Sequence, residues 1–248
     1  MRDRFGFKTI RLLRRGRVAW LILNRPEELN AYNVAMRDEM CEALAAVGEL
    51  AGVGALVLAG AGPAFSTGGD LTEFGRAPSP VAARWIRFRR DVWGLLRALA
   101  IPTVAAVHGY AVGGGLEMVL LCDLAVAAKE ARFCFPETGR GMIPGVCGTQ
   151  TAPRRLGLGW ALDLSLTGRW IDAETALSIG LVAEVAPLRR LRAAAGDLAR
   201  ELSRLPGLQV RAAKTAVREG LDLPLSQALR LERRLAAALE GFARRAPG

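Results

Sequence analysis

The sequence is poor in the residue types on which several common kinds of active site depend. It contains a single histidine, so sites built on two histidines are excluded and a Ser-His-Asp triad would depend on His108 alone. No Gly-x-Ser-x-Gly elbow accompanies that histidine, which argues against a serine hydrolase. We therefore interpret His108 as a turn residue.

The cysteines lack the spacing of a metal or redox site. None forms a Cys-x-x-Cys pair, and no cluster of histidines accompanies them, so zinc and dithiol chemistry are excluded and we expect no metal site. We interpret them as small buried apolar residues. They stand at positions 41, 122, 134 and 147.

Glycine motifs for nucleotides are missing as well. The glycine-rich stretch at 60–70 lacks the terminal Gly-Lys-Ser/Thr of a P-loop. Its Gly60-x-Gly62 is followed by Phe65, where a dinucleotide fingerprint requires glycine. Nucleotide hydrolysis and dinucleotide binding are thus not expected, while a plain structural loop stays open as an interpretation of this stretch.

One hydrophobic stretch is long enough to cross a membrane, but its composition argues against that. Residues 104–128 include His108, Glu117 and Asp123 together with a glycine-rich break, and charged groups are costly inside a bilayer. The first eight residues contain no apolar segment of the kind found in signal peptides. We therefore expect a cytoplasmic protein without a membrane partner.

The composition is that of a chain that can bury a large hydrophobic core. Of the 248 residues, 51% are apolar and 23% are charged, which fits one large domain, with or without an appendage. The net charge is +10, and residues 189–248, with 13 basic and 6 acidic side chains, carry +7 of it. This charge reflects either a GC-rich genome, which favours arginine, or a polyanionic ligand, namely a phosphate-bearing cofactor or nucleic acid. Because no RNA-reading motif accompanies the charge, we do not expect nucleic acid as a partner.

Apolar periodicity predicts an α/β fold followed by helices alone. Strand-like apolar runs alternate with helical patterns up to about residue 187, as in domains whose strands are buried on both faces. After residue 187 only helical patterns remain, and they are interrupted at Pro206 and Pro224. We predict an α/β core at 1–187 and a helical region at 188–248. Strands are expected at 18–23, 54–59, 103–107, 124–128 and 132–135, and helices at 34–50, at 81–99 and from Gly114 onward.

Two glutamates stand in surroundings that are costly for a charge. Glu117 lies in the apolar run 112–121, three residues after Gly114, and Glu137 follows a Phe-Pro pair. On a helix that begins near Gly114, this spacing returns the Glu117 carboxylate to the first turn, where free N–H groups can bind an anion. Acid/base chemistry is one interpretation. The structural alternatives are a satisfied buried glutamate at 117 and a helix-start carboxylate at 137.

Taken together, these segments resemble the enoyl-CoA hydratase/isomerase (crotonase) family over nearly the whole chain. The order and spacing of the segments make the resemblance specific, although no single segment would be specific by itself. The segments are Leu-Asn-Arg-Pro at 23–26 with Asn30 and Ala31, Pro-Ala-Phe-Ser-Thr-Gly-Gly-Asp-Leu at 63–71, the run at 102–123, Phe-Pro-Glu at 135–137, Ile-Pro-Gly at 143–145 and Gly-Thr-Gln at 148–150.

The resemblance implies a spiral of ββα units with C-terminal helices that build a homotrimer or a dimer of trimers. It also implies an acyl-CoA thioester as substrate, so that coenzyme A is part of the substrate and no cofactor is needed. The family's two N–H donors to the thioester oxygen correspond to those of Thr67 and Gly114. Substrate-binding positions correspond to Ser66, Thr67, Gly68, Gly69, Asp70, Gly113 and Gly114.

The implied reaction is the addition of water across the 2,3 double bond of a 2-enoyl-CoA, which yields a 3-hydroxyacyl-CoA. The family's two catalytic glutamates correspond to Glu117, as the base that positions water, and Glu137, as the proton donor to C2. The presence of both favours a hydratase. The alternative is another reaction of the superfamily, namely double-bond isomerisation, decarboxylation or a specialised pathway hydration.

The chain departs from the family pattern near the expected coenzyme A. Thr67 stands where alanine is common, Thr72 where a lysine is frequent, and Thr151 where an arginine is usual. The C-terminal end, at 239–245, looks shortened relative to the family. The contacts that this end usually makes to a neighbouring subunit's coenzyme A correspond at most to Phe242, Arg244 and Arg245.

Overall fold

A computed structural model describes residues 6–243, without the side chains of residues 84, 87, 88 and 241–243. Over this range the strands form a six-stranded sheet of order β1-β2-β3-β4-β6-β9 and a three-stranded sheet of order β5-β7-β8. The strands are β1 (Ile10–Arg15), β2 (Val18–Leu23), β3 (Ala55–Gly60), β4 (Thr103–Val107), β5 (Tyr110–Val112), β6 (Leu124–Ala128), β7 (Arg132–Cys134), β8 (Ile171–Asp172) and β9 (Glu184–Ala186).

The larger sheet is parallel from β2 onward, whereas β1 pairs antiparallel with β2. Strands β2, β3 and β4 are buried along their whole length, which explains why their sequences are continuous apolar runs instead of alternating ones. Because parallel strands end at the same edge of a sheet, the segments that follow β2, β3 and β4 come together there. The candidate residues Thr67, Gly114 and Glu117 lie on the segments that follow β3 and β4, whereas Glu137 follows β7 of the smaller sheet.

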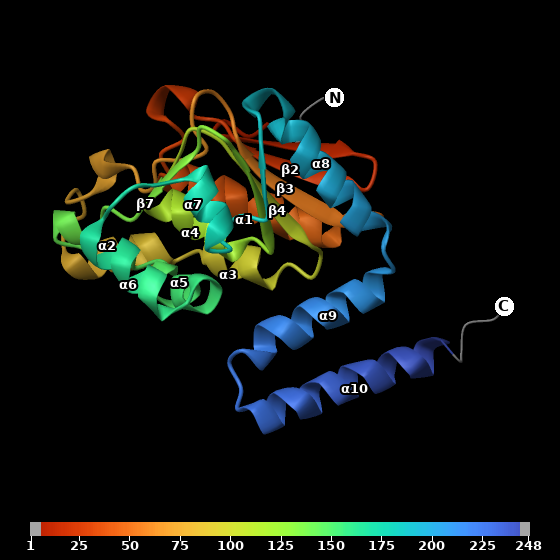
Figure 1. Cartoon of the computed structure of the whole chain (residues 1–248). Coiled ribbons are helices and arrows are strands. Elements are labelled where there is room, and N and C mark those ends of the chain that lie inside the picture. Colours follow the sequence, from red (N-terminus) through yellow and green to blue (C-terminus); the bar gives the residue numbers. More distant parts are fainter. Residues whose placement is uncertain (1–5, 244–248) are drawn as a thin grey trace.

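Helices cover both faces of the larger sheet (Figure 1). One core cluster joins α1 and α4 to one face, through residues such as Leu21, and a second joins α8 to the other, through residues such as Trp20. The helices are α1 (Val34–Glu49), α2 (Pro80–Phe88), α3 (Val92–Ala98), α4 (Gly114–Leu121), α5 (Gly148–Leu156), α6 (Leu158–Thr167), α7 (Ala173–Ser178), α8 (Leu188–Arg204), α9 (Gly207–Gly220) and α10 (Leu225–Ala243), with 3-10 turns η1 (Pro26–Glu28), η2 (Leu71–Glu73) and η3 (Thr138–Arg140).

The predicted α/β fold class is confirmed, and so are the predicted strands and most helices, to within one residue at their ends. The helix expected at 81–99 was wrong in one respect, because it is two helices, α2 and α3. Asp91 starts the second one, since its side chain accepts a hydrogen bond from the Gly94 N–H at 2.8 Å. Strands β1, β5, β8 and β9 were not predicted.

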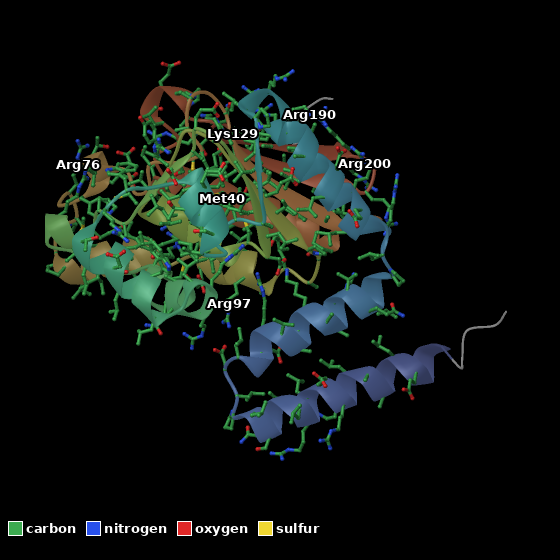
Figure 2. All side chains as sticks on the ribbon, in the orientation of Figure 1. Met40, Arg76, Arg97, Lys129, Arg190 and Arg200 are labelled. Carbon is green, nitrogen blue, oxygen red and sulfur yellow. The ribbon has the colours of Figure 1, made fainter. Side chains whose placement is uncertain are left out.

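The three C-terminal helices differ in how they contact the core. Helix α8 packs on the larger sheet, while α9 and α10 pack on each other and extend away from it (Figure 1). Side chains join α9 to the core. Asp123, directly after α4, accepts hydrogen bonds from Lys214 at 2.7 Å and Arg218 at 2.9 Å. Arg97 lies on the side of the core that faces α9 (Figure 2), and it pairs with Asp222 at 2.9 Å.

The predicted boundary at 187/188 falls between β9 and α8. Among the helices of residues 6–243, none combines the length and the apolar character that crossing a membrane requires.

Candidate active site

The turn that follows β2 holds the segment that follows β3. Asn30 is fully buried, and its side-chain amide donates to the carbonyls of Ala61 and Ala64, both at 2.8 Å. Its side-chain oxygen accepts from the Arg25 N–H at 2.9 Å. Leu29 and Asn30 both adopt positive φ angles, 51° and 56°, which are uncommon for residues other than glycine. The resemblance included Asn30, but nothing in the sequence pattern indicated that it joins two loops.

The β3–η2 loop (residues 61–70) lies directly against the start of α4. The Ser66 N–H donates to the Tyr110 carbonyl, and the Val112 N–H donates to the Ser66 carbonyl, each at 3.0 Å. A methyl group built on Gly68 would lie 2.6 Å from the Val112 carbonyl oxygen and 2.9 Å from the Gly114 nitrogen. Glycine is therefore required for this approach.

Ser66 and Asp70 serve the shape of this loop through their side chains. The buried Ser66 hydroxyl donates to the Asn30 carbonyl at 2.9 Å and accepts from the Gly68 N–H at 3.2 Å. Asp70 pairs with Arg25 at 2.9 Å and accepts from the Thr72 hydroxyl at 2.7 Å. Burial alone would raise the pKa of Asp70, but hydrogen bonds from Thr72 and Arg25 outweigh it and hold that pKa below its usual value.

The two predicted N–H donors stand in different surroundings. Gly114 is the first residue of α4, where no helical carbonyl is available to its N–H group. The Thr67 N–H donates to the Leu29 carbonyl at 3.2 Å, and the Thr67 hydroxyl lies 3.4 Å from the same oxygen. The structure thus brings Gly68, the neighbour of Thr67 in sequence, against Gly114, while the Thr67 N–H already has a protein acceptor.

Glu117 has a well-defined set of partners. It is only 2% exposed, and its Oε1 accepts hydrogen bonds from the N–H groups of Val146 at 3.1 Å, Cys147 at 2.8 Å and Gly148 at 2.6 Å. These N–H groups stand at the start of α5, where the helix dipole favours a negative charge. They stabilise Glu117 as a carboxylate. Sequence spacing did not indicate these donors, which lie 29 to 31 residues away along the chain.

Glu137 has a contrasting environment. It is half-buried, and its Oε2 is buried without a hydrogen-bond partner among the residues described. Burial, with a smaller contribution from the negative charge of Glu117, raises the pKa of Glu137 to about 7, although a hydrogen bond from its own backbone N–H and the charge of Arg140 oppose the shift. A methyl group on Gly113, which has a φ of 52°, would lie 2.4 Å from its Oε1. The carboxyl group therefore covers the turn that leads to Gly114.

Other candidate groups have structural roles. The His108 Nε2 lies 2.8 Å from the Gly62 carbonyl oxygen, and burial lowers the pKa of the imidazole, which fits the predicted turn residue. All four cysteines are free thiols, and burial raises the pKa of Cys147 to about 12, which excludes a reactive thiolate. In the part of the chain that the structure describes, no three His, Cys, Asp or Glu side chains come together as metal ligands.

A groove of about 270 Å³ lies on the α8 face of the sheet, between α8 and β2. It is lined by Arg15, Trp20, Arg192 and Arg200 among others, and neither glutamate contributes to it. Glu117 belongs to the opposite face of the sheet, on which its helix α4 packs.

A family model described as enoyl-CoA hydratase/isomerase matches residues 14–243. The chain belongs to this family. A probable enoyl-CoA hydratase of Mycobacterium tuberculosis is 38% identical over 92% of this chain and 88% of its own length. The 2,3-dehydroadipyl-CoA hydratase of Escherichia coli is 37% identical over 90% of this chain and 86% of its own length. The crystal structure of an enoyl-CoA hydratase from Bacillus anthracis superposes with a TM-score of 0.88 at 31% identity and covers 95% of each chain.

Membership in the enoyl-CoA hydratase/isomerase family confirms the predicted crotonase-like fold and the predicted class of enzyme, a hydro-lyase of the enoyl-CoA hydratase type. The individual roles of Glu117, Glu137, Thr67 and Gly114 stay predictions, as does the trimer. The suggested contacts of Arg244 and Arg245, and of the Phe242 side chain, lie outside the described residues.

Proposed function

We propose that this chain hydrates a 2-enoyl-CoA to a 3-hydroxyacyl-CoA, with Glu117 as the base and Glu137 as the acid. The proposal is carried by the unequal environments of these two carboxyl groups around the Gly113–Gly114 turn. Three N–H donors favour the ionised form of Glu117. Burial, which outweighs a hydrogen bond from the residue's own backbone N–H and leaves Oε2 without a partner, favours the protonated form of Glu137. A base and an acid that face one turn supply what the addition of water requires.

In the proposed complex the thioester oxygen accepts hydrogen bonds from the N–H groups of Thr67 and Gly114. These donors would polarise the thioester and stabilise the negative charge that develops on its oxygen during the reaction. One such donor typically contributes about 3 to 4 kcal/mol to transition-state stabilisation. The start of α4 adds the favourable end of a helix dipole at Gly114.

The proton transfers balance as follows. The Glu117 carboxylate takes one proton from a water molecule while the water oxygen bonds to C3, and the electron pair of the double bond moves toward the thioester. Protonated Glu137 gives its proton to C2. The two carboxyl groups have then exchanged protonation states, so a proton passes from Glu117 back to Glu137 through solvent before the next turnover.

Double-bond isomerisation is the second candidate, because the family description covers hydratases and isomerases alike. A shift of the double bond needs one group that removes a proton and returns it at another carbon. Glu137, whose pKa is about 7, could do both. This alternative predicts products that contain no added oxygen, so mass analysis of products from 2-enoyl-CoA and 3-enoyl-CoA substrates separates the two reactions.

The direct test compares Glu117→Gln and Glu137→Gln with the unaltered chain in the hydration of crotonyl-CoA. Each substitution keeps the shape of the side chain but removes one proton-transfer group, so we expect turnover to fall by about 100-fold to 10,000-fold. Glu201→Gln, at an exposed position on α8, is the matched control and should leave turnover unchanged.

Because Glu117 also caps α5, thermal unfolding of each variant must accompany the assay. A glutamine oxygen can still accept from the three N–H groups, so we expect the Glu117→Gln chain to remain folded. Folded Glu117→Gln and Glu137→Gln chains that hydrate crotonyl-CoA at the unaltered rate would contradict the proposed roles. Failure of the unaltered chain to hydrate any enoyl-CoA would contradict the proposed function itself.

A further inference from the structure

The Leu29 carbonyl oxygen stands opposite two donors of one residue. It accepts from the Thr67 N–H at 3.2 Å, and the Thr67 hydroxyl lies 3.4 Å away. Hydroxyl donors usually approach to about 2.5 to 3.0 Å, so the hydroxyl is at the outer limit of a hydrogen bond and the N–H is the principal donor. The Leu29 carbonyl thus accepts a hydrogen bond from the Thr67 N–H, and the Thr67 hydroxyl is close enough to become a second donor.

The Leu29 carbonyl cannot easily turn away from this position. Leu29 and Asn30 both have positive φ angles, and the Asn30 side chain ties them to Arg25, Ala61 and Ala64. The Leu29 N–H is itself bonded to the Pro26 carbonyl at 3.1 Å. The acceptor is therefore held rigidly against the β3–η2 loop, and a change of hydrogen bonding must come from the Thr67 side.

The proposed reaction requires such a change. If the Thr67 N–H donates to the thioester oxygen, the Leu29 carbonyl loses its principal donor, and an acyl-CoA that covers the loop restricts access of water to it. A carbonyl left without a partner is costly, and this penalty opposes full donation of the N–H to the substrate. The side-chain hydroxyl can remove the penalty, because it already faces the same acceptor at 3.4 Å and needs only a small shift to donate to it fully.

We propose that the Thr67 hydroxyl is a positioning group that takes over the Leu29 carbonyl when the Thr67 N–H turns to the thioester oxygen. The inference rests on the proposed function and adds a side-chain role to a position that had been assigned only a backbone donor. The hydroxyl acts through the N–H and does not touch the reacting atoms. Its effect is to strengthen polarisation of the thioester, mainly in the transition state, where the charge on oxygen is largest.

Three substitutions separate the hydroxyl from the shape of the side chain. Thr67→Ser keeps the hydroxyl and removes the methyl group, Thr67→Val keeps the branched shape and removes the hydroxyl, and Thr67→Ala removes both. We expect Thr67→Ser to retain kcat within about twofold, and Thr67→Val and Thr67→Ala each to lose about fivefold to tenfold in kcat, the effect of one hydrogen bond. KM should change less than kcat in both, because the affected interaction strengthens as the reaction proceeds.

A spectroscopic measurement tests the same idea without turnover. Butanoyl-CoA labelled with carbon-13 at the thioester carbonyl is saturated and cannot be hydrated, so its carbonyl stretching band reports polarisation in the bound state. The band should lie lowest in the unaltered chain and in Thr67→Ser, and higher in Thr67→Val and Thr67→Ala.

The inference is overturned if Thr67→Val matches the unaltered chain in kcat and band position, or if Thr67→Ser is as impaired as Thr67→Val. If the unaltered chain hydrates no enoyl-CoA, the proposed function fails instead. The infrared comparison then decides the role of the Thr67 hydroxyl by the same criterion, provided that circular dichroism shows all variants folded.

Discussion

At the scale of single residues, the protonation of Glu137 links its surroundings to the pH dependence of the proposed reaction. Burial raises the pKa of this carboxyl group to about 7, so near neutrality a substantial fraction holds the proton that C2 would receive. Since the protonated form is the active acid, kcat/KM should be highest below about pH 7 and should fall about tenfold per pH unit above it.

The measurement is a profile of kcat/KM for crotonyl-CoA from about pH 5 to about pH 9, in which the free enzyme determines the apparent pKa. The residual activity of Glu137→Gln should lack the decline at high pH, because that variant has no proton to lose at this position. A flat profile for the unaltered chain through neutral pH, or an unchanged decline in Glu137→Gln, would rule out Glu137 as the proton donor.

The sequence indicated the candidate residues of the site but only part of what surrounds them. Glu117 and Glu137 could be identified because carboxylates in apolar segments need a reason to be there. The N–H donors to Glu117 could not, since they come from a turn that only the fold brings near. The same holds for Asn30, whose partners are carbonyls of another loop, and for the carbonyl that faces Thr67.

At the scale of elements, Asp123 connects α4, β4 and α9. It accepts hydrogen bonds from the Thr103 N–H at 2.8 Å and the Thr103 hydroxyl at 2.9 Å, and it pairs with Lys214 and Arg218. Asp123→Asn would leave two largely buried cations without their counter-charge. We expect it to lower the free energy of unfolding by about 2 to 4 kcal/mol, as measured by urea denaturation.

Asp197→Asn provides the matched control, because Asp197 pairs with Arg200 on α8 with both side chains more than half exposed. Exposed pairs contribute little, so we expect a change below about 0.5 kcal/mol. Equal losses of unfolding free energy in Asp123→Asn and Asp197→Asn would mean that the pairs of Asp123 with Lys214 and Arg218 do not hold α9 to the core.

The strands and helices could be predicted to different degrees, for reasons of burial. Strands β2, β3 and β4 are buried throughout and stand out as apolar runs. Strand β1 lies at the sheet edge, where exposed arginines at 11, 14 and 15 interrupt the apolar pattern, and it was missed. The break between α2 and α3 depends on one cap by Asp91, a signal too local to stand out in a helical pattern.

At the scale of the whole molecule, α9 and α10 present an apolar surface that this chain does not cover. None of the residues of α9 is buried, and large apolar side chains near the α9–α10 connection are strongly exposed. They include Val217 at 65%, Leu221 at 61% and Leu225 at 74% exposure. Surfaces of this kind mark interfaces between proteins.

The resemblance implies that further copies of the chain cover this surface, so we expect a trimer or a pair of trimers in solution. Sedimentation equilibrium should give three or six times the mass of one chain. Leu225→Asp should shift the protein toward smaller species, because it places a charge in the interface. Leu188→Asp, an exposed leucine at the start of α8, is the control and should leave the mass unchanged. A monomer at micromolar concentration would exclude the predicted assembly.

The three hydrogen bonds that hold Glu117 have one more consequence, which concerns the proposed catalytic cycle over time. A neutral carboxyl group accepts hydrogen bonds more weakly than a carboxylate, so the N–H groups of 146–148 lose part of their partner each time Glu117 carries a proton. They regain it when the proton leaves. The N–H groups at the start of α5 would thus favour loss of the proton from Glu117 after each turnover. The hydrogen bonding of the α5 backbone would in turn change with the protonation state of Glu117.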